Sequence, residues 1–273
     1  MNQARISFIR ENVSILNDKK ALPILEQLKG IKILDIGCGG GLVAESLARL
    51  GAVVTAIDPS EENIRAAKLH SSLDPLTKNI RYYNQSVESM SQSSEKFDVV
   101  CVLEVIGKIS TFFKIIEIKV LFLLFFLNLL LTEHVDDPEQ FIKSCLSCLK
   151  PESQSSPPSI FFSTINRTLK SYALAIISAE YILGLIPPKT HDWNKFKTPR
   201  ELEMSLHREN FSINRIQGII PSFVNSIQNK NIDHKMRNQL LNGHLLSDWV
   251  LSDNDLDVNY IFHAAPLKNK KDI

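Results

Sequence analysis

Residues 31–41 read Ile-Lys-Ile-Leu-Asp-Ile-Gly-Cys-Gly-Gly-Gly, an apolar run that ends in a cluster of glycines. A short apolar run closed by glycine predicts a strand that is buried on both faces of a parallel sheet. Residues 41–49 then carry apolar side chains at helical spacing, which predicts a helix directly after the glycines. This order of strand, glycine-rich turn and helix is typical of the nucleotide-binding units of doubly wound α/β proteins.

The alternation of strand and helix continues along the chain. Asp58 and Pro59 close a second strand and start a helix, because proline and the glutamates that follow favour a first helical turn. Strands that alternate with helices at this interval predict an α/β fold with a doubly wound, mostly parallel sheet. The further strands are expected at 52–57, 79–83, 97–103, 160–163 and 258–264, and the helices at about 59–69 and 138–149.

Length and composition limit the classes of protein to which the chain can belong. Its 273 residues, 44% hydrophobic and 22% charged, fit one globular domain over residues 1–273. A formal net charge of +1 leaves no basic surplus, so we expect no nucleic-acid partner. Residues 1–16 mix charged and apolar side chains, so we expect no signal peptide there.

Two of the four cysteines, Cys145 and Cys148, have the spacing of a redox or zinc pair. No second pair completes a zinc site, and both residues fall in a stretch predicted to be helical. We therefore expect buried structural thiols in a reducing compartment.

The glycine-rich turn is a candidate nucleotide site. Gly37 and Gly39 permit a ligand to approach the backbone closely, and Asp35 stands at the strand end, where it could accept a hydrogen bond near a cationic amino-acid ligand. Asp58 follows Gly37 by 21 residues, a spacing that suits ribose hydroxyls. Glycine turns of this kind also bind NAD or FAD. The form Asp-x-Gly-Cys-Gly-x-Gly, however, resembles the signature of class I S-adenosylmethionine-dependent methyltransferases.

Several other stretches resemble one methyltransferase family. They are Met-Asn-Gln-Ala-Arg (1–5), Ala-Lys-Leu-His (67–70), Phe-Phe-Ser-Thr-Ile-Asn-Arg (161–167), Ala-Glu-Tyr-Ile-Leu (179–183), Thr-His-Asp-Trp (190–193) and Val-Asn-Tyr (258–260). Together with the glycine turn, they are similar to the O-methyltransferases of ubiquinone synthesis, which act on polyprenyl-dihydroxybenzoate and demethylubiquinol. The stretches at 163–167 and 179–183 are much more specific than the glycine turn.

This resemblance implies a Rossmann-like, mostly parallel seven-stranded sheet with a final antiparallel strand, and S-adenosyl-L-methionine as the cofactor. The loop Ser86-Val87-Glu88 resembles the one that faces the adenine, although a solvated turn would read the same way. The residues expected at the cofactor are Arg5, Asp35, Gly37, Gly39, Asp58, Ser86 and Leu103.

The family also carries a metal-binding Glu-x-x-Glu-His pattern directly after the fourth strand. Here the resemblance assigns the metal to Glu104, Glu133 and His134, with Glu104 and His134 as catalytic residues. Two carboxylates and an imidazole suit Mg²⁺ or another divalent cation. Such a cation would orient a catechol and favour its phenolate, because a phenol with a pKa near 10 is a poor nucleophile.

Residues 107–132 separate the two halves of this metal pattern. They include the apolar run Val120–Leu131, which is shorter than the roughly 20 residues that span a bilayer. Gly107-Lys108 can be encoded as GGTAAG and Thr132-Glu133 as ACAGAA, which supply a splice donor and an acceptor. Excision between them leaves Glu-Val-Ile-Glu-His in frame, so we interpret the segment as a translated intron; the alternative is a membrane hairpin or anchor. We expect the uninterrupted chain to be poorly soluble and nearly inactive.

Three further regions differ in character from the rest of the domain. Residues 165–200 resemble the family's membrane-contacting lid, although an ordinary buried helix would read the same way. Residues 218–246 are a divergent polar loop, and the chain begins inside the family's first segment, as if truncated at the N-terminus.

The expected partners are a polyprenylated catechol or quinol substrate, a peripheral membrane contact and a ubiquinone-synthesis complex. If the intron is real, the expected location is the matrix face of the mitochondrial inner membrane. The alternatives are a methyltransferase of other small molecules and a catalytically impaired isoform that only binds cofactor or partners.

Overall fold

The computed structural model describes residues 1–103, 137–152, 157–182, 192–222 and 249–267. Its strands are β1 (Lys32–Ile36), β2 (Val53–Asp58), β3 (Arg81–Asn84), β4 (Val99–Leu103), β5 (Ser159–Ile165), β6 (Phe211–Pro221), β7 (Trp249–Ser252) and β8 (Asn259–Pro266). Its helices are α1 (Asn2–Leu16), η1 (Ile24–Glu26), α2 (Leu42–Arg49), α3 (Glu61–Ser71), α4 (Val87–Ser91), α6 (Pro138–Ser147), α7 (Leu169–Ser171), η2 (Tyr172–Ile182), η3 (Trp193–Lys195) and α8 (Pro199–Arg208).

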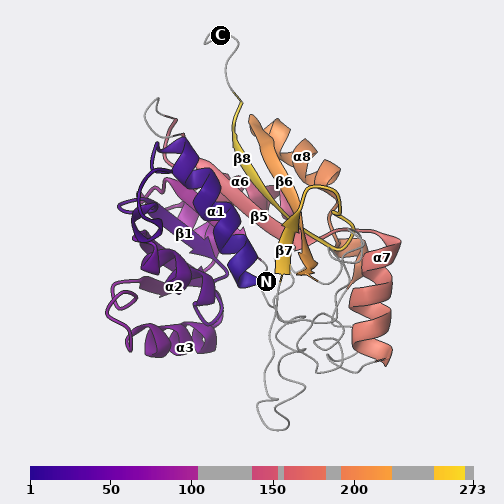
Figure 1. Ribbon diagram of the computed structural model, residues 1–273, viewed down its shortest axis with the longest axis horizontal. Coiled ribbons are helices and arrows are strands. Elements are labelled where there is room, and N and C mark those ends of the chain that lie inside the picture. Colours follow the sequence, from indigo (N-terminus) through magenta and orange to yellow (C-terminus); the bar gives the residue numbers. More distant parts are fainter. Residues whose placement is uncertain (104–136, 153–156, 183–191, 223–248, 268–273) are drawn as a thin grey trace.

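One sheet runs through the molecule in the order β3-β2-β1-β4-β5-β8-β6-β7 (Figure 1). The strands β3, β2, β1, β4 and β5 pair in parallel, whereas β8 lies antiparallel between β5 and β6. The predicted α/β class, with its mostly parallel sheet and antiparallel last strand, is confirmed. The described residues form eight strands and not seven, because β7 adds a short antiparallel edge strand beside β6.

Strand β1 shows why the opening apolar run predicts a buried parallel strand. Ile33 packs into one core cluster, and Leu34 and Ile36 pack into the other, so both faces of the strand are covered. Strand β4 alternates in the same way, with Cys101 on the first side and Val102 on the second. A strand buried on both faces needs apolar residues throughout, which produces the continuous apolar runs of the sequence.

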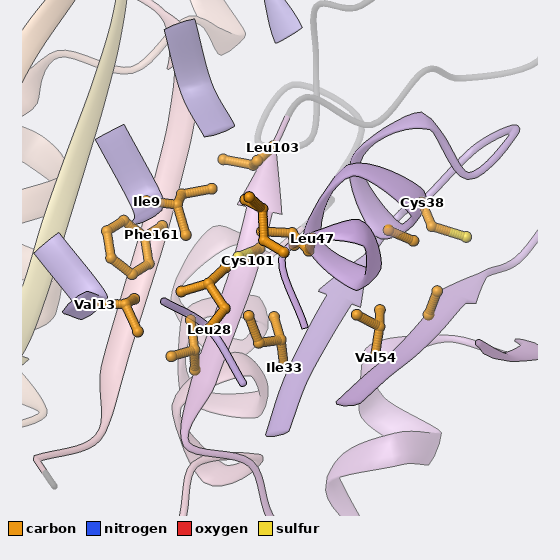
Figure 2. Packing of buried hydrophobic residues seen from close by; sticks show 14 of the residues in the cluster. Ile9, Val13, Leu28, Ile33, Cys38, Leu47, Val54, Cys101, Leu103 and Phe161 are labelled. Atoms are coloured by element: carbon orange, nitrogen blue, oxygen red, sulfur yellow. The ribbon is translucent and has the colours of Figure 1, made fainter. Parts of the chain in front are cut away.

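Helices cover both faces of the sheet. The first core cluster joins α1, α2 and α3 to one face, and the second joins α4, α6 and α8 to the other. Figure 2 shows the first side, where Ile9 and Val13 of α1 lie beside Phe161 of β5. Burial of these clusters supplies the main driving force for the fold.

Several elements were not foreseen from the sequence. α1 has weak apolar periodicity, yet it buries Phe8, Ile9 and Val13 against the sheet. Residues 218–221, assigned from the sequence to a divergent loop, instead continue strand β6, which pairs with β8 and β7. The remainder of that loop and the apolar segment 107–132 lie outside the described residues.

Cys145 lies on helix α6 and Cys148 is the C-cap of that helix; both thiols are free and buried. Burial raises the pKa of Cys148 to about 11 and that of Cys145 well above its usual range, so both remain protonated. Their predicted role as structural thiols is therefore consistent with the fold. Among the described residues, no helix combines the length and the apolar character needed to cross a membrane.

Candidate functional site

The glycine turn crosses from the end of β1 to the end of β2. The backbone N–H groups of Gly37 and Cys38 both donate to the carbonyl of Ile57, over 2.7 and 3.0 Å. The N–H of Gly41 then closes the turn on the Cys38 carbonyl, over 2.9 Å. Gly37, Gly39 and Gly41 all have positive φ, a conformation that costs glycine little and other residues much more.

Asp58, at the end of β2, fixes the middle of this turn. Its carboxylate is buried and accepts three hydrogen bonds: Oδ2 from the Gly39 N–H (3.0 Å), and Oδ1 from the Ser60 N–H (2.8 Å) and from Asn63 Nδ2 (3.1 Å). Asn84 at the end of β3 donates to the Asp58 carbonyl over 3.1 Å. A carboxylate oxygen accepts up to two hydrogen bonds, so Oδ2 retains capacity for a ligand hydroxyl.

The two faces of the glycine turn are different. Among the described residues, a methyl group added at Gly39 or Gly40 would meet nothing within 4 Å, so the described part of the chain leaves this side open. A methyl group at Gly41 would lie 2.5 Å from the Tyr82 hydroxyl oxygen and 3.2 Å from the Ala67 methyl group. The turn therefore packs against Tyr82 and Ala67 at Gly41, and it leaves room for a ligand beside Gly39 and Gly40.

Asp35 carries an unsatisfied oxygen inside the site. Its side chain is buried, and Oδ2 has no hydrogen-bond partner among the described residues. Burial raises the pKa of Asp35 to about 7; the nearby Asp58 carboxylate adds to the rise, and the Ala44 amide opposes it. A cationic group placed against this oxygen would favour the ionised carboxyl.

Two of the other predicted cofactor residues, Leu103 and Ser86, lie at the same end of the sheet, and the third, Arg5, lies on α1. Leu103 is the last residue of β4, directly beyond the pairing of Ile36 with Val102, and it is buried. Arg5 is also buried, on the first turns of α1. Ser86 is exposed after β3 and caps α4 through its hydroxyl, which accepts from the Ser89 N–H.

The structure therefore brings the ends of β1, β2, β3 and β4 together as the sequence predicts. The roles of the individual residues at a cofactor stay predictions. The open side above Gly39 and Gly40 and the unpaired Asp35 oxygen fit a ligand with a cationic amino-acid end. Those two features suit the S-adenosylmethionine expected from the sequence.

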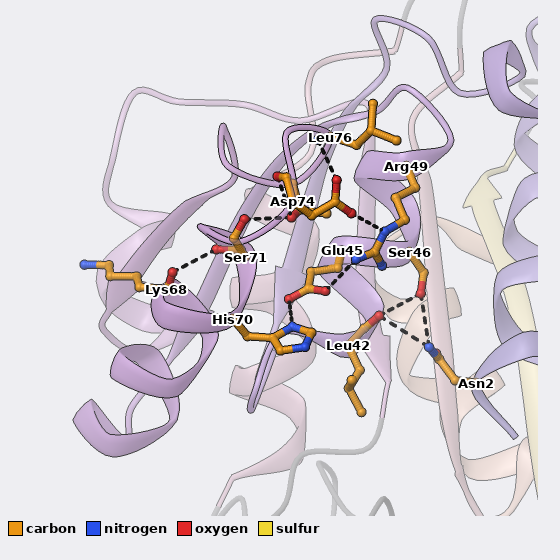
Figure 3. A network of polar contacts seen from close by, with 11 residues as sticks. Asn2, Leu42, Glu45, Ser46, Arg49, Lys68, His70, Ser71, Asp74 and Leu76 are labelled. Atoms are coloured by element: carbon orange, nitrogen blue, oxygen red, sulfur yellow. Dashed lines mark hydrogen bonds and ion pairs between the residues drawn. The ribbon is translucent and has the colours of Figure 1, made fainter.

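Behind the turn, a polar network joins α2 to α3 (Figure 3). Glu45 is buried and contacts His70 Nδ1 at 2.6 Å and Arg49 Nη2 at 3.0 Å. Arg49 also donates to Asp74 over 2.8 Å. The network ties the helix that follows the glycines to the helix that follows Asp58.

Sequence reasoning missed Gly40, Tyr82 and Asn84 as members of the site. Gly40 could have been found as the remaining glycine of the turn, since the sequence places it between Gly39 and Gly41. Tyr82 and Asn84 carry no motif, and only the register of β3 against β2 brings them beneath the turn.

The predicted metal ligands Glu104, Glu133 and His134 lie outside the described residues. Within the described ranges, no group of three or more His, Cys, Asp and Glu side chains is placed to hold a metal ion. The donor set itself, two carboxylates and an imidazole, remains chemically suited to a divalent cation.

Residues 165–200, predicted from the resemblance to form a lid, begin at the end of β5, where two contacts hold the first residues of the segment. Asn166 Nδ2 donates to the Leu256 carbonyl over 2.9 Å, and Lys170 Nζ contacts Asp255 Oδ2 over 2.9 Å. The helix α7–η2 then buries Ala175 and Ile176 beside Ile165 and Phe196. Its other side is apolar and exposed, as shown by Leu169, Tyr172, Leu174, Ile177 and Tyr181. Figure 1 shows this helix at the edge of the molecule, far from α2 and α3.

Comparison with known proteins agrees with this geometry. Residues 33–115 match the family model described as "Methyltransferase domain". The mitochondrial ubiquinone biosynthesis O-methyltransferase of Arabidopsis thaliana is 34% identical over 273 residues, which cover 100% of this chain and 68% of the relative. The Bos taurus protein of the same name is 39% identical over 224 residues, 81% of this chain and 51% of the relative, so the chain spans about half of that protein.

A solved structure shares the fold. It is the magnesium protoporphyrin IX methyltransferase from Synechocystis PCC 6803 with bound SAH, at a TM-score of 0.54 and 16% sequence identity. The match covers 96% of this chain and 84% of that one. The shared architecture is that of the class I methyltransferases.

Proposed function

Because the chain belongs to the ubiquinone biosynthesis O-methyltransferase family, and so to the S-adenosylmethionine-dependent methyltransferases, we propose that it methylates a catechol hydroxyl of a polyprenylated ubiquinone precursor. The acceptors proposed are polyprenyl-dihydroxybenzoate and demethylubiquinol. The observation that carries the proposal is the site at the ends of β1 and β2, where, among the described residues, the buried Asp35 Oδ2 has no hydrogen-bond partner and the glycine turn has an open side.

In this proposal, the residues of the site bind and orient the two reactants. Asp35 Oδ2 would accept a hydrogen bond from the ammonium group of the cofactor, and the open side of Gly39 and Gly40 would let the cofactor approach the backbone closely. Asp58, already held by Gly39, accepts a ribose hydroxyl through the remaining capacity of Oδ2. When bound, S-adenosylmethionine supplies an electrophilic methyl group, and positioning provides most of the rate enhancement.

A direct test uses the purified chain with S-adenosylmethionine labelled in its methyl group and a short-chain prenyl dihydroxybenzoate. We expect S-adenosylhomocysteine to bind in calorimetry, NAD to give no heat, and the label to move to one catechol oxygen. Binding of NAD without any response to S-adenosylhomocysteine would reject the cofactor assignment. Label on an unrelated small molecule, with none on the prenylated catechol, would favour a methyltransferase of other substrates.

We further propose that a divalent cation, with Mg²⁺ the first choice, is held by Glu104, Glu133 and His134. These residues would bring both catechol oxygens into place and lower the pKa of the reacting hydroxyl. The separation of Glu104 from Glu133 by residues 107–132 favours a second candidate function, a cofactor-binding isoform with impaired turnover. Cofactor affinity and turnover measured on one preparation separate the two candidates.

The exposed apolar side of α7–η2 supports a peripheral membrane contact for a prenylated substrate. Each CH₂ group transferred from water to the bilayer contributes roughly 0.8 kcal/mol, so several such side chains provide useful affinity. The mitochondrial names of the plant and bovine relatives support a mitochondrial location, for which we propose the matrix face of the inner membrane. A ubiquinone-synthesis complex is the proposed protein partner.

A further inference from the structure

We propose that Tyr82 is a positioning residue for the cofactor. Its hydroxyl packs against Gly41 and thereby fixes the position of the glycine turn that contacts the ligand. This inference rests on the proposed cofactor function. It concerns a residue of β3 that the sequence motifs do not include.

The contact between Tyr82 and the turn is close. The Tyr82 side chain is buried, and a methyl group at Gly41 would lie 2.5 Å from its hydroxyl oxygen and 3.2 Å from the adjoining ring carbon. No real methyl group can approach an oxygen so closely. The space beside the Gly41 Cα is therefore filled by the Tyr82 hydroxyl and by the Ala67 methyl group of α3.

Two backbone hydrogen bonds link Gly41 to the turn that precedes it and to the helix α2 that follows it. The Gly41 N–H donates to the Cys38 carbonyl over 2.9 Å, and its carbonyl accepts from the Glu45 N–H over 2.9 Å. Glu45 is in turn held by His70 and Arg49, as Figure 3 shows. A shift at Gly41 would therefore move the ligand-facing turn on one side and the first turn of α2 on the other.

Strand pairing fixes the backbone of Tyr82, while its buried hydroxyl has no hydrogen-bond partner among the described residues. Tyr82 pairs with Ala56 in the parallel ladder of β2 and β3, two residues before Asp58 along β2. Burial also raises the pKa of its hydroxyl above the usual range, so the group stays neutral. The strands β2 and β3 thus provide two contacts to the turn. Asp58 accepts a hydrogen bond from Gly39, and Tyr82 packs against Gly41.

The first test compares Tyr82→Phe with Tyr83→Phe, since Tyr83 is the exposed neighbour on the same strand. Removal of the Tyr82 hydroxyl leaves a gap beneath Gly41, so we expect the affinity for S-adenosylhomocysteine to fall about fivefold, with the acceptor KM unchanged. Tyr83→Phe should bind as the unaltered chain does. Equal affinity in both variants would overturn the proposal, whereas an unaltered chain that binds no S-adenosylhomocysteine would refute the cofactor function instead.

The second test asks whether Tyr82 and Gly41 act through each other. Gly41→Ala should lose most of its affinity, because the new methyl group meets the hydroxyl and the positive φ is strained. The double variant Gly41→Ala, Tyr82→Phe should recover part of that loss, since it lacks the hydroxyl. Strictly additive losses would overturn the proposal. If Gly41→Ala does not fold, recovery of folding in the double variant supports the contact, and the comparison with Tyr83→Phe decides the effect on affinity.

Discussion

Gly39 and Asp58 are joined by a 3.0 Å hydrogen bond from the backbone N–H of one to Oδ2 of the other. The bond links the turn after β1 to the end of β2 through groups of the protein itself. Such an internal link reduces the ordering that cofactor binding would otherwise require.

Asp58→Asn should disrupt this link. Whichever way the amide is turned, its NH₂ group faces a backbone donor, either the Gly39 N–H or the Ser60 N–H. We expect a loss of about 1–3 kcal/mol in the free energy of unfolding and more than about tenfold in affinity for S-adenosylhomocysteine. Thermal melting and calorimetry measure the two effects, and Asp74→Asn, in the polar network behind the turn, serves as the control. Unchanged cofactor affinity in Asp58→Asn would contradict the assignment of Asp58.

The Asp35 carboxyl should make cofactor binding depend on pH. With a pKa raised to about 7, it is mostly protonated at pH 6 and mostly ionised at pH 8. An ammonium ligand prefers the ionised form, so S-adenosylhomocysteine affinity should fall by about tenfold from pH 8 to pH 6. Asp35→Asn should bind weakly at both values, with a flat profile. A pH dependence that persists in Asp35→Asn would assign the titration to another group.

The raised pKa of Asp35 also makes stability depend on pH. Cofactor affinity should increase as pH rises, whereas the contribution of Asp35 to stability should decrease. The folded chain keeps a proton on this carboxyl up to about pH 7, whereas the unfolded chain releases it near the usual aspartate pKa of 3.8. The folded state therefore binds more protons across this window, and the contribution of Asp35 to stability decreases as pH rises. Denaturant melts of the unaltered chain and Asp35→Asn should diverge between pH 4 and 7, in this sense. Parallel curves would show that the pKa is not raised.

Gly40→Ala should lower cofactor affinity without changing the stability of the fold. The added methyl group meets nothing within 4 Å in the part of the chain that the structure describes, so the melting temperature should stay the same. It would occupy the side proposed for the cofactor, so affinity should fall by about tenfold or more. Gly218→Ala is the opposite case, because its methyl group would lie 1.7 Å from the Asp255 carbonyl oxygen. That variant should lose stability, and full cofactor affinity in Gly40→Ala would place the ligand elsewhere.

The apolar side of α7–η2 should determine membrane binding. Leu174 and Ile177 are both more than two-fifths exposed, at 43% and 41%. Changing both to glutamate should greatly reduce co-sedimentation with phospholipid vesicles, because charge is costly in the acyl region. Leu73→Glu is the matched control, because Leu73 is 78% exposed and lies just after α3, a different part of the fold from α7–η2. Equal loss in both variants would indicate a general effect of charge and would contradict a specific contact.

Deletion of residues 107–132 should restore the metal-dependent reaction. The joined chain reads Glu104-Val105-Ile106-Glu133-His134, which is the contiguous family pattern. We expect it to be more soluble than the uninterrupted chain and to lose turnover in chelator while cofactor affinity stays the same. Robust turnover of the uninterrupted chain would refute the proposed effect of the segment, and full activity of the deletion variant without metal would refute the metal site.

Most of the strands predicted from the sequence are buried on both faces; the edge strand β3, in which only Tyr82 is buried, is the exception. β1 and β4 lie inside the sheet, so their apolar runs are continuous and unmistakable. β6 was missed because it has mixed character: Asn214 and Arg215 interrupt its first half, where the register against β8 shifts. β7 was missed because it is four residues long and only half-buried.

The site divides in a similar way. Asp35, Gly37, Gly39 and Asp58 follow from spacing, since strand ends and glycine turns leave local signals in the sequence. The support from Tyr82 depends on strand register, which brings together residues 41 positions apart and leaves no local pattern. The difference between the open and supported faces of the turn could likewise be found only from packing.

The position of β8 has a consequence for how the chain is made. Strands β6 and β7 leave the ribosome before β8, yet they join the rest of the sheet only through it. Until β8 is translated, β5 and β6 each present an unpaired edge, the type of surface that favours aggregation. The half of the sheet that carries the glycine turn can pair earlier, because β1 to β5 depend on no later strand. During synthesis, the half of the sheet that carries the glycine turn can therefore form first, and β8 completes the sheet last.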